Sequence, residues 1–350
     1  MKLISHRSST IASGCKTLVS LSATLTLNLA LISSAQAAEF ADFIFLVDES
    51  GSMGGEHSWL TTTVGDLDIA LQEKGVGTGT VENRYGLVGF GGTTGKLGRS
   101  LSVGGVGGSL FGSATELATS TNFLVTTGSF EDGYSAIDYA LNNYSFRDGA
   151  AVNFVLVTDE DRDNGNDSLN FDNILSRLQA KNALLNVVVN HQMTDKNGRQ
   201  VIGADRDGNV FLADGIGGYS TIADGLNSSP TQGTNQFGYP GQLNPWTGKP
   251  ISPASYVNTT KSDYVDMAWA TGNSNISGAA WDLNLLRSGG ATADSFNAAF
   301  VDIKATEAWQ QTGNGVEEKQ KIPEPTTVLG LLGVAALGIR KRSASPSGSS

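Results

Sequence analysis

The feature that most constrains the fold is an uncharged apolar run that ends in a loop of oxygen-bearing side chains. Residues 43–53 read FIFLVDESGSM, so five apolar residues are followed by Asp48, Ser50 and Ser52 at alternate positions. A continuous apolar run of this length is typical of a strand that is covered on both faces in a parallel sheet. Gly51 allows the tight backbone that turns both hydroxyls toward one point. We therefore expect a buried strand with a polar loop at its carboxyl end.

The loop offers one carboxylate and two hydroxyls, which together form a hard-oxygen donor set. Such a set suits Mg²⁺, Mn²⁺ or Ca²⁺ and is poor for zinc. The alternative is a strand-to-helix turn in which Ser and Asp only cap the helix. Spacing within this one loop does not distinguish the two interpretations. A metal site would need a further ligand from another part of the chain.

A candidate for this further ligand is Asp159, which follows a later apolar run, VNFVLVT at residues 152–158. In doubly wound sheets the ligand crevice lies outside the carboxyl ends of the strands, at the point where the strand order reverses. Asp48 and Asp159 would share that rim. Two converging carboxylates repel each other unless a cation lies between them. The sequence therefore predicts a divalent metal site at this edge of the sheet.

Strand and helix patterns alternate through the first half of the chain. Strands are expected at residues 43–47, 85–90, 97–103, 152–158 and 184–189. Helices are expected at residues 59–73, 134–141 and 173–181. Strands that alternate with helices imply right-handed crossovers. The predicted fold class is α/β, with a doubly wound, mainly parallel sheet.

The composition changes after Asn190. Residues 194–276 are rich in Gly, Asn, Ser, Thr, Asp and Pro, and include a predicted hairpin around the turn at residues 205–208. Regular patterns return at residues 279–286 and in a helix at residues 293–308. We interpret residues 194–276 as an irregular insertion into one domain formed by residues 38–193 and 277–312. A separate small lobe is the alternative.

Two motifs carry a resemblance to a known family. DESGSM after the first strand and TDED (residues 158–161) after a later one resemble the metal-ion-dependent adhesion site (MIDAS) of von Willebrand factor A (vWA) domains. The resemblance covers residues 40–192 and, less closely, residues 279–309. It implies a vWA/Rossmann-like fold and an open metal position that takes a carboxylate from a partner. The direct or water-bridged ligands that it implies for Mg²⁺, or for Mn²⁺ or Ca²⁺ in its place, are Asp48, Ser50, Ser52 and Asp159.

One loop departs from the family pattern. The family usually has a Thr ligand before its central helix, whereas residues 128–133 here read GSFEDG. Phe130 cannot bind a metal, so the ligand is either missing or supplied by Glu131 or Asp132. A carboxylate in place of a hydroxyl would strengthen cation binding and weaken capture of an acidic partner. Alternatively, both acids would only favour the positive N-terminus of the following helix.

The N-terminus is typical of a secretory signal peptide. Basic residues precede an uncharged apolar stretch at residues 18–32, and Ala35-Gln36-Ala37 offers a cleavage site of small residues. We expect residues 1–37 to be removed and the chain to be exported. Cys15 is the only cysteine and lies in this segment, so the processed chain would contain no disulfide.

The C-terminal segment, residues 313–350, has the pattern of a second targeting signal. Ile322-Pro323-Glu324-Pro325 precedes an apolar run at residues 326–339, which Arg340-Lys341-Arg342 closes. The run is shorter than the roughly 20 residues that span a bilayer. The three parts in this order resemble the PEP-CTERM sorting tail of Gram-negative and cyanobacterial exported proteins. The resemblance implies a transient membrane anchor, recognition by an exosortase-type enzyme, and delivery to the cell envelope or extracellular matrix.

Other function classes find little support. A net charge of −11 argues against a nucleic-acid partner. No nucleophile elbow follows a strand, no His pair has zinc spacing, and no glycine-rich loop fits a nucleotide. We therefore predict a non-enzymatic, metal-dependent adhesion or binding protein that holds a protein or polysaccharide ligand outside the cell. The alternative is a structural envelope or matrix protein whose metal only stabilises the fold.

Overall fold

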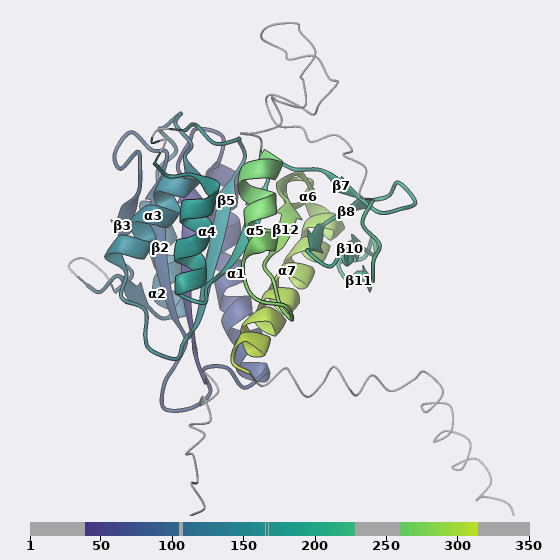
Figure 1. Ribbon diagram of the computed structural model, residues 1–350, viewed down its shortest axis with the longest axis horizontal. Coiled ribbons are helices and arrows are strands. Elements are labelled where there is room, and N and C mark those ends of the chain that lie inside the picture. The colour runs from purple at the N-terminus through teal and green to yellow at the C-terminus, as the bar shows by residue number, and fades with distance from the viewer. Residues whose placement is uncertain (1–38, 105–107, 165, 167, 228–259, 314–350) are drawn as a thin grey trace, which may run out of the picture. The chain divides into compact units, whose positions relative to one another are not determined.

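The computed structural model describes residues 39–104, 108–164, 166, 168–227 and 260–313 (Figure 1). The predicted signal peptide and almost all of the predicted sorting tail lie outside these residues, as does much of the segment 194–276. Within the described residues, no helix is long and apolar enough to cross a membrane.

Five parallel strands form the centre of a ten-stranded sheet. They lie in the order β12-β6-β5-β1-β2, so that β1 has β2 on one side and β5 on the other. The strand order reverses between β1 and β5, which makes their carboxyl ends the switch point. The predicted α/β class with a doubly wound, mainly parallel sheet is confirmed. The bounds of these strands are β1 Ala41–Asp48, β2 Arg84–Phe90, β5 Ala151–Thr158, β6 Leu184–Val189 and β12 Ala279–Asp282.

Antiparallel strands extend the sheet at both edges. β3 (Arg99–Leu101) and β4 (Phe111–Gly112) pair with β2. At the other edge β9 (Gly203–Asp205) pairs with β12, and β10 (Val210–Ala213) and β11 (Tyr219–Ile222) follow it. The turn at residues 205–208 and the second strand of the predicted hairpin are present, and β9 and β10 are continuous with the main sheet. The first strand, expected at residues 199–202, is instead β9, and residues 200–201 form β8. A separate two-stranded sheet contains β7 (Met193–Thr194) and β8 (Gln200–Val201).

Helices cover both faces of the sheet, which explains the continuous apolar strands. Alternate residues of β1 enter different cores: Phe43, Phe45 and Val47 face one helix layer, and Ile44 and Leu46 face the other. The first layer contains α1 (Gly54–Glu73), α2 (Ala114–Ser120) and α7 (Gly290–Gln311). The second contains α3 (Gly133–Asn143), α4 (Phe171–Ala180) and α5 (Asp266–Ala270) (Figure 1). The short helices are η1 (Thr121–Phe123), η3 (Lys261–Val265) and α6 (Leu283–Arg287).

Residues 279–286 form two elements in place of one. β12 ends at Asp282, whose carboxylate Oδ1 accepts a hydrogen bond from the backbone N–H of Asn284 at 3.0 Å and caps α6. The chain therefore turns sharply at the carboxyl edge of the sheet. This turn places Arg287, the last residue of α6, near the loop after β1.

Candidate metal centre

Asp48 is the last residue of β1 and is fully buried. Its Oδ1 accepts a hydrogen bond from the backbone N–H of Ser50 at 2.7 Å, and its Oδ2 accepts one from Thr158 Oγ1 at 2.8 Å. Thr158 is the last residue of β5, the parallel neighbour of β1. The backbone carbonyl oxygen of Asp48 lies 2.9 Å from His57 Nε2. The loop after β1 and the last residue of β5 therefore fix this carboxylate at the switch point, and α1 contacts the backbone of the same residue.

The two serines connect Asp48 to the second strand. Ser50 Oγ lies 3.1 Å from Ser52 Oγ, and Ser52 Oγ donates to Asp159 Oδ1 at 3.0 Å. The structure thus brings together all four residues that the two motifs supply. Their oxygens converge because parallel strands end at one edge of the sheet.

Glu49, between these residues, is directed elsewhere. Its carboxylate accepts hydrogen bonds from Arg99 Nε and from the backbone N–H of Val125, both at 2.8 Å. The charge of Glu49 is therefore paired with an arginine of the edge strand β3.

The loop before α3 contributes Glu131, and it directs Asp132 away from the other carboxylates. Glu131 is buried, and one of its oxygens lies near oxygens of Asp48 and Asp159. Asp132 is the N-cap of α3, and accepts hydrogen bonds from the backbone N–H groups of Tyr134 and Ser135. It also accepts from Ser135 Oγ at 2.8 Å and pairs with Arg162 at 2.7 Å. Of the two acids proposed from the sequence, Glu131 has the position to bind the cation.

Phe130 has a separate partner. The ammonium nitrogen of Lys96 lies 3.8 Å from the centroid of its ring. This cation–π contact holds the ring against Lys96. The residue of this loop that lies beside Asp48 and Asp159 is the neighbouring Glu131.

The three carboxylates form a compact cluster. Asp48, Glu131 and Asp159 each offer an oxygen, and these atoms all lie within 4.8 Å of one another. Burial, together with the neighbouring negative charges, raises the pKa of Asp48 to about 6 and that of Glu131 to about 9. The protein alone therefore disfavours three ionised carboxylates at this point.

A divalent cation fits this cluster. Glu131 Oε2 is buried and has no hydrogen-bond partner among the described residues. Buried polar atoms are rarely left in this state, and an ion is one of the usual reasons. Carboxylates with nearby hydroxyls are the donors that Mg²⁺, Mn²⁺ and Ca²⁺ prefer.

Arg287 adds a positive charge beside the cluster. Its Nη2 donates to Asp159 Oδ2 at 3.0 Å and to the carbonyl oxygen of Ser52 at 3.2 Å. Its Nε donates to Glu56 Oε1 at 2.6 Å, in the first turn of α1. Asp159 is therefore shared between Ser52 on one oxygen and Arg287 on the other. A cation that bound Asp159 would do so next to a guanidinium.

Comparisons with known proteins find similarity at the level of solved structures. No protein-family model and no curated protein matches this sequence. A von Willebrand factor type A structure from Catenulispora acidiphila is 13% identical, with a TM-score of 0.30, and the match covers 43% of this chain and 33% of that one. The manganese-loaded TRAP protein of Plasmodium vivax is 21% identical, with a TM-score of 0.30, over 44% of this chain and 58% of that one.

Proximal thread matrix protein 1 from the mussel byssus is also similar. It is 14% identical, with a TM-score of 0.33, over 44% of this chain and 38% of that chain. The chain thus spans between a third and three fifths of the length of these three structures.

Proposed function

We propose that this chain is an exported vWA-type protein that uses a divalent cation to bind a protein or polysaccharide ligand outside the cell. The observation that carries the proposal is the convergence of three buried carboxylates at the switch point of the sheet, one with an oxygen that lacks a hydrogen bond. Mg²⁺ is the proposed ion, with Mn²⁺ or Ca²⁺ as substitutes that favour the same donors.

Each residue of the site has a distinct task in this proposal. Asp48, Glu131 and Asp159 would hold the cation together with the hydroxyls of Ser50 and Ser52. When bound, the ion would supply an electrophile for an oxygen atom of the ligand. Thr158 and the backbone N–H of Ser50 hold the Asp48 carboxylate in one orientation, so little reorganisation is needed on binding.

A binding role is favoured over catalysis by the histidines. His57 contacts the backbone carbonyl oxygen of Asp48. His191 is buried, and burial lowers its pKa to about 3, so it is a weak proton acceptor near neutral pH.

The alternative function is structural: an envelope or matrix protein in which the ion only stabilises the fold. Glu131 is the observation that favours it. Three carboxylates exceed the charge of a divalent cation, which reduces the attraction between the bound ion and an acidic partner.

An Asp48→Ala variant distinguishes the two functions. The variant and the wild type would be used to capture ligands from envelope or matrix material, with and without EDTA, and their melting temperatures compared. Loss of capture, with melting temperatures that are equal when both proteins are compared in EDTA, supports the binding function. Retained capture with a melting temperature that is lower only when the cation is present supports the structural one. Glu73→Gln, at the far end of α1, is a matched control that removes an exposed carboxylate.

If Mg²⁺, Mn²⁺ and Ca²⁺ all leave the melting temperature of the wild type unchanged, the proposed metal site is refuted. Both functions assume a bound divalent cation, so that outcome would contradict both.

Sorting is a separate part of the proposal. We expect an exosortase-type enzyme to recognise the tail at residues 313–350 and release the protein to the envelope or matrix. Mass spectrometry of the protein isolated from its native cell tests this. A chain that begins near Ala38 and ends before Ser350 is expected, and an intact C-terminus would count against sorting.

A further inference from the structure

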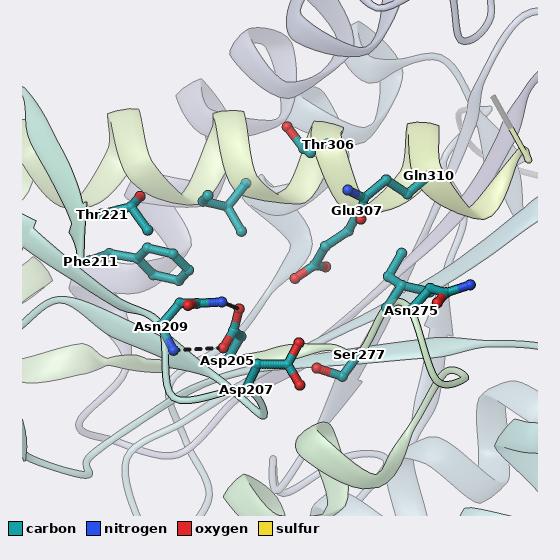
Figure 2. Close-up of a pocket in the computed structure, with 12 residues that line it drawn as sticks. Asp205, Asp207, Asn209, Phe211, Thr221, Asn275, Ser277, Thr306, Glu307 and Gln310 are labelled. Carbon is teal, nitrogen blue, oxygen red and sulfur yellow. Dashed lines mark hydrogen bonds between the residues drawn. The ribbon is translucent and has the colours of Figure 1, made fainter. Parts of the chain in front are cut away.

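A second candidate site lies at the amino ends of the parallel strands, whereas Asp48 lies at their carboxyl ends. A cavity of about 200 Å³ is enclosed by the hairpin β9–β10, the residues before β12 and the C-terminal half of α7 (Figure 2). Ser277, which precedes β12, lies at these amino ends. The cavity is thus independent of the metal centre.

Two oxygen atoms at this cavity, Ser277 Oγ and Glu307 Oε1, accept no hydrogen bond from the described residues. Ser277 is only 9% exposed and forms no hydrogen bond with any described residue. Its hydroxyl points across the cavity toward Asp207 (Figure 2). Glu307 is 6% exposed; its Oε2 accepts hydrogen bonds from Lys304 at 2.9 Å and from Asn186 at 2.6 Å. Its Oε1 accepts none from the described residues. Both oxygens are open to the cavity. A ligand in the cavity can therefore take these hydrogen-bonding positions in place of water.

The charges around the cavity favour a cation. Asp205, Asp207 and Glu307 line it. Both oxygens of Asp205 accept hydrogen bonds from neutral groups of Asn209, at 2.9 and 2.7 Å. Lys304 is fully buried and lies on the core side, where its ammonium is 5.9 Å from the ring centroid of Phe43. The negative charge that faces the cavity is therefore only partly offset.

Arg206 compensates Asp207 weakly. Its Nε lies 3.8 Å from Asp207 Oδ1, and its Nη2 donates to the carbonyl oxygen of Asn273 at 2.8 Å. More than half of the Asp207 side chain remains exposed at the mouth of the cavity.

The lining residues and the volume of the cavity favour an organic cation over a bare metal ion. In the described part of the chain, three carboxylates come within 4.8 Å of one another at Asp48, Glu131 and Asp159, and no such trio is found at the cavity. Ile276, Ile303 and Phe211 provide apolar wall. The volume corresponds to about seven water molecules, which suits a short carbon chain.

We propose that this cavity binds a small primary amine in its ammonium form. The ammonium would donate to Ser277 Oγ and Glu307 Oε1, attracted by Asp205 and Asp207. Its methylene groups would lie against Ile303. A primary ammonium has three donors and no acceptor, which matches a site that offers unused acceptors.

The test is calorimetric titration of the full chain with n-butylammonium chloride at pH 7 in the presence of EDTA. We expect saturable binding to the wild type, and an affinity about tenfold lower for Ser277→Ala, which removes one hydrogen bond to a charged group. Asp207→Asn should also weaken binding. Asp172→Asn, which removes an exposed carboxylate of α4 on the other face of the sheet, should not.

Butan-1-ol is the matched probe, with the same carbon chain and no charge. Equal affinity for butan-1-ol, or equal affinity of wild type and Ser277→Ala for butylammonium, would overturn the proposal. So would Ca²⁺ binding in a metal titration without EDTA that Ser277→Ala abolishes. Circular dichroism confirms that Ser277→Ala is folded. Unchanged butylammonium affinity in Asp48→Ala is expected, so that a failure at the metal centre does not affect this result.

Discussion

The carboxyl group of Glu131 titrates far from its ordinary range, because burial and the nearby Asp48 raise its pKa to about 9 from 4.5. Without a cation, the folded protein therefore binds a proton at neutral pH that the unfolded chain releases. The stabilising effect of this proton is fully present below about pH 4.5 and is lost as the pH rises through 9. Asp48 acts in the same direction between its ordinary value of 3.8 and about 6.

We therefore expect the metal-free protein to lose stability as the pH rises from about 5 to about 9. Urea unfolding in EDTA across this range measures the effect. Glu131→Gln, which cannot ionise, should flatten the dependence above pH 6. A variant whose unfolding midpoints follow those of the wild type at every pH would contradict the assignment.

Asp132 provides a second test at the residue scale. Asp132→Asn should lower the free energy of unfolding by about 2 kcal/mol, because it keeps an N-cap side chain for α3 but removes the charge that pairs with the buried Arg162. Its affinity for Mn²⁺, measured by electron paramagnetic resonance, should stay close to that of the wild type. A large loss of Mn²⁺ affinity in a folded variant would show that Asp132 is a ligand after all.

At the scale of the elements, the central strands could be predicted and the short elements could not. Strands such as β1 have a continuous apolar run because both faces are buried, and this pattern is visible in the sequence. The seven-residue helix α2 has a capping box at Ser113 and Glu116 but too few turns for a clear apolar period. The loops that carry Asp48 and Asp159 could be predicted as candidate sites because they follow strands directly.

Arg287 could not be predicted as part of the site. Its partner Glu56 lies 231 positions away, and nothing in the local pattern around either residue connects them. Their contact depends on the sharp turn between β12 and α6, which follows from tertiary packing. The choice between Glu131 and Asp132 also needed the structure, because both lie at the start of α3 in the sequence.

The contact between α6 and α1 can be tested with Arg287→Ala. Removal of the guanidinium leaves the Glu56 carboxylate buried without its partner and should destabilise the metal-free protein by about 1–3 kcal/mol. It also frees Asp159 Oδ2, so the affinity for Mn²⁺ should increase. Arg287→Lys keeps the charge and loses the fork-shaped donor, so we expect intermediate values. Weaker Mn²⁺ binding in Arg287→Ala would mean that Arg287 supports the site in another way.

At the scale of the whole molecule, the two ends of the parallel strands have two different candidate sites. The carboxyl edge has clustered carboxylates near serine hydroxyls, and the amino edge has a cavity with separated acids and an apolar wall. Ligands at the two edges should therefore stabilise the protein independently and additively.

Removal of the metal should have a large effect on the whole fold. Mn²⁺ at 100 times its Kd would stabilise the protein by about 2.7 kcal/mol, which corresponds to an increase in Tm of roughly 5–10 °C. Differential scanning calorimetry with Mn²⁺ and then with excess EDTA measures this change. Asp48→Ala should show no increase, and an increase of wild-type size in that variant would place the ion elsewhere.

The position of β1 in the middle of the sheet has a consequence for the order of folding. β1 is the first described strand, yet one of its neighbours begins at Ala151, far along the chain. Contacts between such distant segments form slowly, because a long loop must close first. Until β5 arrives, the loop after β1 lacks Thr158 and Asp159 and has only part of its oxygens in place. We therefore expect helices such as α1 to form early in refolding, while the capacity to bind a cation arises only as the central sheet closes.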